Sequence, residues 1–267
     1  MRTTTSGRQQ MSVLNSLVES IRSGAIEVID LTAPLSSRTP ILMLPEPFGN
    51  TVPFQLTEIS RYDDRGPAWY WNDITTGEHT GTHFDAPIHW VTGRDGEDVS
   101  QVAPARLIGP AAVLDFAGRA AEDPDFLLQI EDVKEWENAN GPLPDGGWLL
   151  YRTGWDARAD DQGSFLNADE TGPHTPGISV ECAKWLAEET AIAGLGVETV
   201  GTDAGAAHSF DPAFPCHSFL LGAGKYGLTQ LRNLDRLPAT GAVVLAPPLP
   251  IVGGSGSPVR VLALVER

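Results

Sequence analysis

The segment His79–His89 constrains this chain more than any other part of its sequence. It reads His-Thr-Gly-Thr-His-Phe-Asp-Ala-Pro-Ile-His and holds half of the 6 histidines in the chain. A helix is not expected here, because Gly81, two β-branched threonines and Pro87 all disfavour it. We therefore predict an extended or looped segment, with a turn at Gly81.

The polar side chains of this segment alternate, which predicts where they point. Residues two apart in a strand share a face, so His83, Asp85, Pro87 and His89 would lie on one side. The turn would bring His79 to the same point. Imidazole and carboxylate groups are the ligands that divalent transition metals accept, and burying them together without a cation is costly. The sequence therefore predicts a catalytic metal site and a hydrolase.

Composition bounds the remaining possibilities. The 267 residues are 41% hydrophobic, which is typical of a globular chain of one large or two small domains. A net charge of −17 disfavours nucleic acid and anionic membranes as partners, and no apolar run approaches a membrane span. The polar start Met1–Gln10 lacks a signal-peptide core, and Cys182 and Cys216 form no Cys-x-x-Cys pattern. We expect a cytoplasmic protein.

Hydrophobic periodicity predicts an N-terminal helical segment, residues 1–24, followed by one domain over residues 25–267. Helices are expected over residues 11–22, 131–140 and 179–190, the last with Ser179 as its N-cap. Strands are expected over residues 28–31, 54–59, 69–74, 111–116, 148–153, 195–202, 242–246 and 259–265. Many strands and few helices indicate an α/β or α+β domain with a mixed sheet.

Three polar residues outside the segment are candidates for the site. His217 would be a further ligand or a hydrogen-bond donor to substrate. His208 sits in an expected loop and is more consistent with a surface histidine. Gln230 would be a ligand, a substrate contact or simply structural.

Aromatic residues flank the segment. Trp69, Trp71, Trp90 and Phe84 would either line a pocket for a flat apolar substrate or pack in the core. The glycine-rich stretch 253–257 does not open a predicted helix and has no lysine, so it is not a phosphate loop. The chain has no Gly-x-Ser-x-Gly motif, which disfavours a serine hydrolase of that type.

The His79–His89 string resembles the signature of the cyclase family of metal-dependent hydrolases. The similarity covers nearly all of the chain after residue 25. It includes Thr153–Asp156, Phe165–His174, Gly201–Gly205, Asn233–Asp235 and Gly256–Arg260.

This resemblance implies a swivelling β/β/α fold with a mixed central sheet and a homo-oligomer, commonly a dimer. His79, His83 and Asp85 would be metal ligands, and His89 the catalytic acid/base. His217 would be a second site histidine that contacts substrate, together with the tryptophans above. The implied reaction opens a cyclic amide, with isatin to isatinate favoured. The alternatives are hydrolysis of N-formylkynurenine and, in a different class, a non-catalytic metal or ligand binder.

The chain departs from the family pattern at Gln230. Family members that hydrolyse formylkynurenine carry a glutamate near this position, where it helps to hold a second metal. The neutral Gln230 favours one metal per chain. The resemblance favours Mn²⁺ over Zn²⁺, although histidine and aspartate suit both ions.

Overall fold

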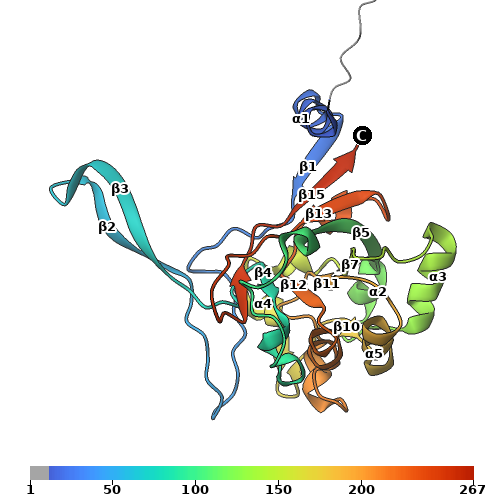
Figure 1. Cartoon of the computed structure of the whole chain (residues 1–267). Helices are drawn as coiled ribbons and strands as arrows, with labels where there is room; N and C mark the ends of the chain where they lie inside the picture. Colours follow the sequence, from blue (N-terminus) through green and yellow to red (C-terminus); the bar gives the residue numbers. More distant parts are fainter. Residues whose placement is uncertain (1–11) are drawn as a thin grey trace, which may run out of the picture.

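The computed structural model describes residues 12–267 of the chain (Figure 1). Residues 1–11, which include the polar start and the first predicted residue of the N-terminal helix, lie outside the described residues. Helix α1 spans Val13–Ser23 and is capped by the side chain of Ser12. Gly24 ends the helix with a φ of 78°, a left-handed conformation that glycine adopts at little cost.

A nine-stranded mixed sheet forms the centre of the fold. Its four middle strands β5, β7, β11 and β12 run parallel, and antiparallel pairs flank them on both sides. This is the mixed α/β sheet that the sequence predicts. Across the sheet the strands are β1 (Ile26–Asp30), β15 (Leu262–Glu266), β13 (Ala242–Leu245), β5 (Ile108–Asp115), β7 (Trp148–Arg152), β11 (Gly194–Val197), β12 (Tyr226–Thr229), β4 (His83–Asp85) and β14 (Gly256–Pro258).

Hydrophobic side chains fill both faces of the sheet. In β7, Trp148 and Leu150 pack in one core, and Leu149 and Tyr151 pack in the other. A strand buried on both faces must be apolar throughout, which explains its uninterrupted apolar run. Helices α3 and α5 cover the second core. The helices after α1 are α2 (Ala117–Glu122), α3 (Ile130–Asn140), α4 (Gln162–Leu166) and α5 (Val180–Glu188).

A long hairpin extends away from this body (Figure 1). Its strands are β2 (Gln55–Asp63) and β3 (Gly66–Thr75), which pair with each other. Trp69 and Trp71 of β3 are 50% and 53% exposed. Two short strand pairs complete the fold: β6 (Leu127–Leu128) with β10 (Gly177–Ile178), and β8 (Ala168–Asp169) with β9 (Gly172–Pro173).

Most predicted elements are confirmed, including all three helices and the cap at Ser179. The strand predicted over residues 195–202 is wrong beyond Val197. The chain leaves the sheet at Glu198, whose carboxylate accepts hydrogen bonds from the backbone of Thr153 and Trp155. The last strand begins only at Leu262. The short elements α2, α4, β12 and β14 are not predicted.

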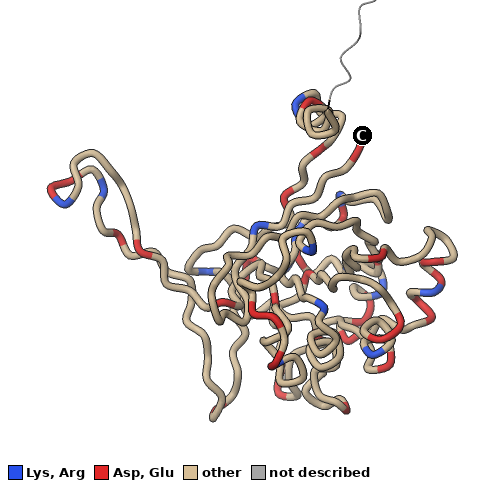
Figure 2. The backbone as a smooth tube through the Cα atoms, viewed as in Figure 1, with Lys and Arg blue, Asp and Glu red and all other residues tan. Residues whose placement is uncertain are grey.

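Acidic residues are spread along the whole body, as Figure 2 shows. They outnumber the basic ones, with 35 Asp and Glu against 18 Lys and Arg in the chain. None of the helices in the described part of the chain is both long enough and apolar enough to cross a membrane.

Candidate active site

Strand β4 carries His83 and Asp85 between two neighbours that leave room for them. Gly227 of β12 and Gly256 of β14 stand directly opposite Asp85. A Cβ atom at Gly227 would lie 2.7 Å from Asp85 Oδ2, and one at Gly256 would lie 2.5 Å from His79 Cε1. Cross-strand partners share a face of the sheet. The two glycines therefore provide the space that the side chains of Asp85 and His79 occupy.

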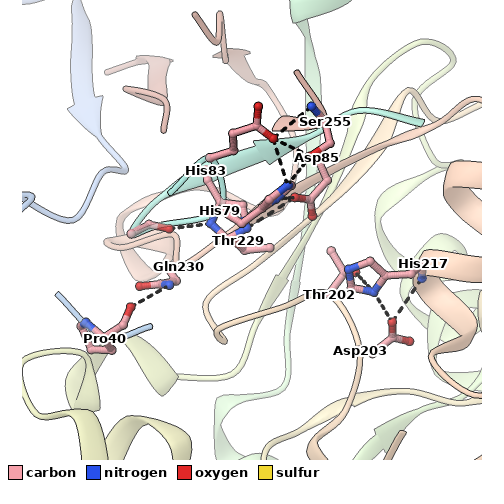
Figure 3. A network of polar contacts seen from close by, with 12 residues as sticks. Pro40, His79, His83, Asp85, Thr202, Asp203, His217, Thr229, Gln230 and Ser255 are labelled. Carbon is pink, nitrogen blue, oxygen red and sulfur yellow. Dashed lines mark hydrogen bonds and ion pairs between the residues drawn. The ribbon is translucent and has the colours of Figure 1, made fainter. Parts of the chain in front are cut away.

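His79 lies in the turn before β4 and is tied to the carboxylate of that strand. Its Nδ1 is 2.8 Å from Asp85 Oδ1, and its Nε2 is 2.8 Å from Ser255 Oγ (Figure 3). Ser255 in turn donates from its backbone and its hydroxyl group to Glu78 Oε2. This network fixes the orientation of the His79 ring.

His83 is buried beside the same carboxylate. Its Nδ1 donates to Gly81 O at 2.8 Å, because a carbonyl oxygen can only accept, and this leaves the lone pair on Nε2. That Nε2 atom is 3.4 Å from Asp85 Oδ1. Burial lowers the pKa of His83 to about 4. The ring is therefore neutral at pH 7, as a metal ligand must be. Gly81 has a φ of 65° and makes the predicted turn.

The segment is extended and then looped, as predicted, but the strand alternation expected for Pro87 and His89 is wrong beyond Asp85. β4 ends there and Pro87 opens a short 3-10 turn, Pro87–His89, because proline has no N–H for the sheet ladder. The turn nevertheless returns His89 to the cluster. Its ring stacks on that of His79, with 3.8 Å between the centroids. Burial lowers the pKa of His89 to about 3, so this ring is also neutral at pH 7.

Three side chains have ligand atoms close enough to share one metal ion. The ligand atoms of His79, Asp85 and His89 all lie within 4.8 Å of one another. His83 stands outside this trio but contacts its carboxylate. Burial alone would raise the pKa of Asp85, but the imidazoles of His83 and His79 offset burial and the net direction is downward. An ionised, buried carboxylate among imidazoles suits a divalent transition metal.

His217 approaches this cluster from a distant part of the sequence. It begins a short helical turn, His217–Leu221, and its ring centroid lies 5.5 Å from that of His89 and 4.8 Å from that of Trp90. Burial lowers the pKa of His217. The hydrogen bond and the charge of Asp203 raise this pKa by more than burial lowers it, so the net direction is upward. The fold thus places His217 beside His89.

The aromatic candidates separate into two groups. Trp90 lies at the site. Its ring centroid is 5.6 Å from that of Phe214, and its Nε1 donates to Ser218 Oγ. Trp69 and Trp71 lie on β3 of the hairpin, which extends away from the body that contains β4 (Figure 1).

Gln230 and His208 point elsewhere. Gln230 is buried, and its side-chain amide donates to Pro40 O at 3.4 Å, away from the histidines (Figure 3). His208 is exposed in a 3-10 turn, and its ring lies near Gly172.

Among the residues that contact the site histidines, sequence reasoning missed Ser255, Thr229 and Asp203 as site residues. Ser255 bonds His79, Thr229 contacts His83 at 2.8 Å, and Asp203 bonds His217. Asp203 carried a signal, since it is a carboxylate soon after a buried strand. Ser255 and Thr229 carried none, because serine and threonine occur everywhere on strands and in loops.

Comparison with known proteins identifies the class to which this fold and site belong. The Cyclase family model, described as "Putative cyclase", matches residues 29–204. The chain belongs to this family.

Within the family, the chain is similar to isatin hydrolase of Roseibium aggregatum, with 46% identity over 96% of this chain and 98% of that protein. A crystal structure of an isatin hydrolase bound to the product analogue thioisatinate is 45% identical and covers 96% of this chain and 100% of its own, with a TM-score of 0.94. Kynurenine formamidase of Salinibacter ruber is 30% identical over 68% of this chain and 74% of that protein.

Proposed function

We propose that this protein is a metal-dependent hydrolase that opens isatin to isatinate. The observation that carries the proposal is the group of His79, Asp85 and His89, whose ligand atoms lie within 4.8 Å of one another in a chain similar to isatin hydrolase. The reaction breaks the lactam C–N bond, adds the oxygen of water to the carbonyl carbon and leaves a carboxylate and an aromatic amine.

The residues present fit a divalent metal ion. Asp85 is 1% exposed, and among the described residues its ion-pair partners are His79 and His83. His83 is neutral at pH 7, and no lysine or arginine in residues 12–267 forms an ion pair with this buried carboxylate. Such a charge is costly unless a cation pairs with it. We assign His79, His83 and Asp85 as the ligands, because the Nε2 atom of His83 lies 3.4 Å from the Asp85 carboxylate that His79 also contacts. The ligand atom of His89 also lies within 4.8 Å of those of His79 and Asp85, but we assign His89 to proton transfer, the role that the resemblance to the cyclase family implies.

The bound ion would supply a polarised carbonyl and a water of lowered pKa. His89, neutral and stacked on a ligand, accepts the proton of the attacking water and returns it to the leaving nitrogen, a role that typically contributes about 10²–10⁴-fold. His217 donates to the oxyanion that develops at the carbonyl oxygen. Trp90 offers an apolar wall for the aromatic ring of the substrate.

The proposed content is one metal ion per chain, Mn²⁺ in preference to Zn²⁺. Gln230 supports the count, because its neutral amide is engaged by Pro40 and would compensate a second dication poorly. Imidazole and carboxylate ligands suit both metals.

We also propose a cytoplasmic homodimer in which residues 25–267 form one catalytic domain. Exposed apolar side chains on two projecting elements support self-association: Val13 and Leu14 of α1, and Trp69 and Trp71 of β3. Apolar patches of this kind mark protein contacts. In a dimer, the hairpin tryptophans would meet a second subunit rather than the site of their own chain. Light scattering at several concentrations and fractionation of cells expressing the tagged chain test these two statements.

N-formylkynurenine is the alternative substrate, since its linear amide breaks by the same chemistry and kynurenine formamidases belong among the relatives. A non-catalytic binder on the same fold is the alternative of another class. The position of His89 in the cluster speaks against a binder, because metal retention by His79, His83 and Asp85 does not require it.

A side-by-side assay separates these functions. The chain, loaded with Mn²⁺ or Zn²⁺, is given isatin and N-formylkynurenine at equal concentrations, with the His89→Asn variant as the matched control. We expect the metal-loaded chain to turn over isatin with the larger kcat/KM and the control to lose that turnover. Preference for N-formylkynurenine would establish the alternative substrate, and hydrolysis of neither would establish the binder.

A further inference from the structure

Asp203 is buried beside the site, and its carboxylate accepts hydrogen bonds from the turn that begins at Cys216. Its Oδ1 accepts from the backbone N–H of Cys216 at 2.6 Å, and its Oδ2 accepts from that of His217 at 3.1 Å. The same Oδ2 lies 2.5 Å from Nδ1 of the His217 ring (Figure 3). Asp203 is 8% exposed, and in residues 12–267 no lysine or arginine pairs with it.

These bonds decide which nitrogen of His217 faces the reaction. An ionised carboxylate can only accept, so the proton of the shared bond belongs to Nδ1. The two backbone bonds hold the carboxylate in place, and the carboxylate then holds the ring. Nε2 is left as the ring nitrogen free to meet a substrate, on a ring already in contact with His89 and Trp90.

We propose that Asp203 is the positioning residue of the reaction: it holds His217 with Nδ1 protonated and Nε2 presented to the substrate carbonyl. The negative charge of Asp203 also favours the positive charge that His217 needs in order to donate from Nε2. The inference rests on the proposed function for its substrate, but the tautomer of His217 is a property of the chain itself. Aspartate–histidine pairs act in this way in hydrolases of other folds.

Asp203→Asn tests the inference, because asparagine has the shape of aspartate but places an NH₂ group against N–H donors. We expect kcat for isatin to fall about 10- to 100-fold, with KM changed less than about threefold. A loss of this size is typical when a residue that hydrogen-bonds and orients a reacting side chain is replaced. Metal content is expected to remain at the wild-type value. Asp115→Asn is the matched control, since Asp115 is a carboxylate paired with Arg152 outside the site; it is expected to keep wild-type kcat.

A double-mutant comparison separates positioning from a purely structural role. If Asp203 acts through His217, then Asp203→Asn costs little further turnover in a chain that already carries His217→Gln. The same fold-loss in both backgrounds would overturn the proposal, as would unchanged turnover in the single variant.

A second readout does not depend on the substrate. Nitrogen-15 NMR of the Zn²⁺-loaded chain, with the His217→Gln spectrum used to assign the signal, reports which ring nitrogen carries the proton. We expect protonated Nδ1 in the wild type and a changed tautomer or charge state in Asp203→Asn. An unprotonated Nδ1 in the wild type would refute the inference even if isatin were hydrolysed. A wild-type chain that has a protonated Nδ1 but does not hydrolyse isatin would refute only the proposed function.

Discussion

Replacing Glu198 with glutamine is expected to change how the stability of the protein depends on pH. Glu198 is 1% exposed at the end of β11, and its Oε2 accepts from Thr153 N at 2.7 Å and from Trp155 N at 3.1 Å. Burial raises the pKa of this carboxyl to about 7, despite the opposing effect of the hydrogen bonds. Folding therefore disfavours the charged form of Glu198.

The sign and size follow from linkage. The folded chain holds a proton on Glu198 at pH values where the unfolded chain, with a pKa of 4.5, has lost it. The stability contributed by Glu198 is thus fully present below pH 4.5 and is lost as the pH rises through 7. At 1.36 kcal/mol for each pKa unit, the full loss is about 3 kcal/mol, of which about 2 kcal/mol falls between about pH 5.5 and pH 8.

Urea unfolding across this pH range measures the effect. Glutamine does not titrate, so the free energy of unfolding of Glu198→Gln minus that of the wild type is expected to rise by about 2 kcal/mol from pH 5.5 to pH 8. Other groups, including the metal site, titrate in both proteins and cancel in the difference. A difference that stays constant with pH, or falls as pH rises, would refute the burial argument.

Two further changes probe the metal site. His83→Asn is expected to lose both stoichiometric metal and turnover, whereas His89→Asn is expected to keep one metal per chain and to lose about 10²–10⁴-fold in kcat. Elemental analysis and kcat are measured for both variants. Equal loss of metal in the two variants would contradict the ligand set. Gln230→Glu is expected to leave one metal ion per chain. It is also expected to destabilise the fold by about 1–3 kcal/mol, because the new carboxylate would face Pro40 O. A second tightly bound ion, or an unchanged thermal unfolding temperature, would contradict this prediction.

The conformation of the segment His79–His89 could be predicted from the sequence because its key relations are local. Residues two apart in a strand share a face, and this places His83 beside Asp85 whatever the rest of the chain does. Gly81 and Pro87 likewise act on their own backbone, so the turn was predicted correctly. The error at His89 was also local: the period-2 pattern continued through Pro87, but the missing N–H of proline ended the strand.

The long apolar runs were readable for a similar reason. The Trp148–Arg152 strand needs apolar residues on both faces, since a core lies on each side of the sheet. The short strand Tyr226–Thr229 contains a glycine and gives no such signal. Its place beside β4 depends on sheet pairing, which a pattern of a few residues does not encode.

The sequence by itself determined the donor chemistry of the site, the extended form of the segment that carries it, and the mixed character of the sheet. The tertiary structure alone decided which donors meet: Ser255 against His79, and the Asp203–His217 pair beside His89. Covalent geometry fixes only the directions of near neighbours in the chain. Contacts across a hundred residues or more arise from the order in which the strands pair and from the close packing of the space between them.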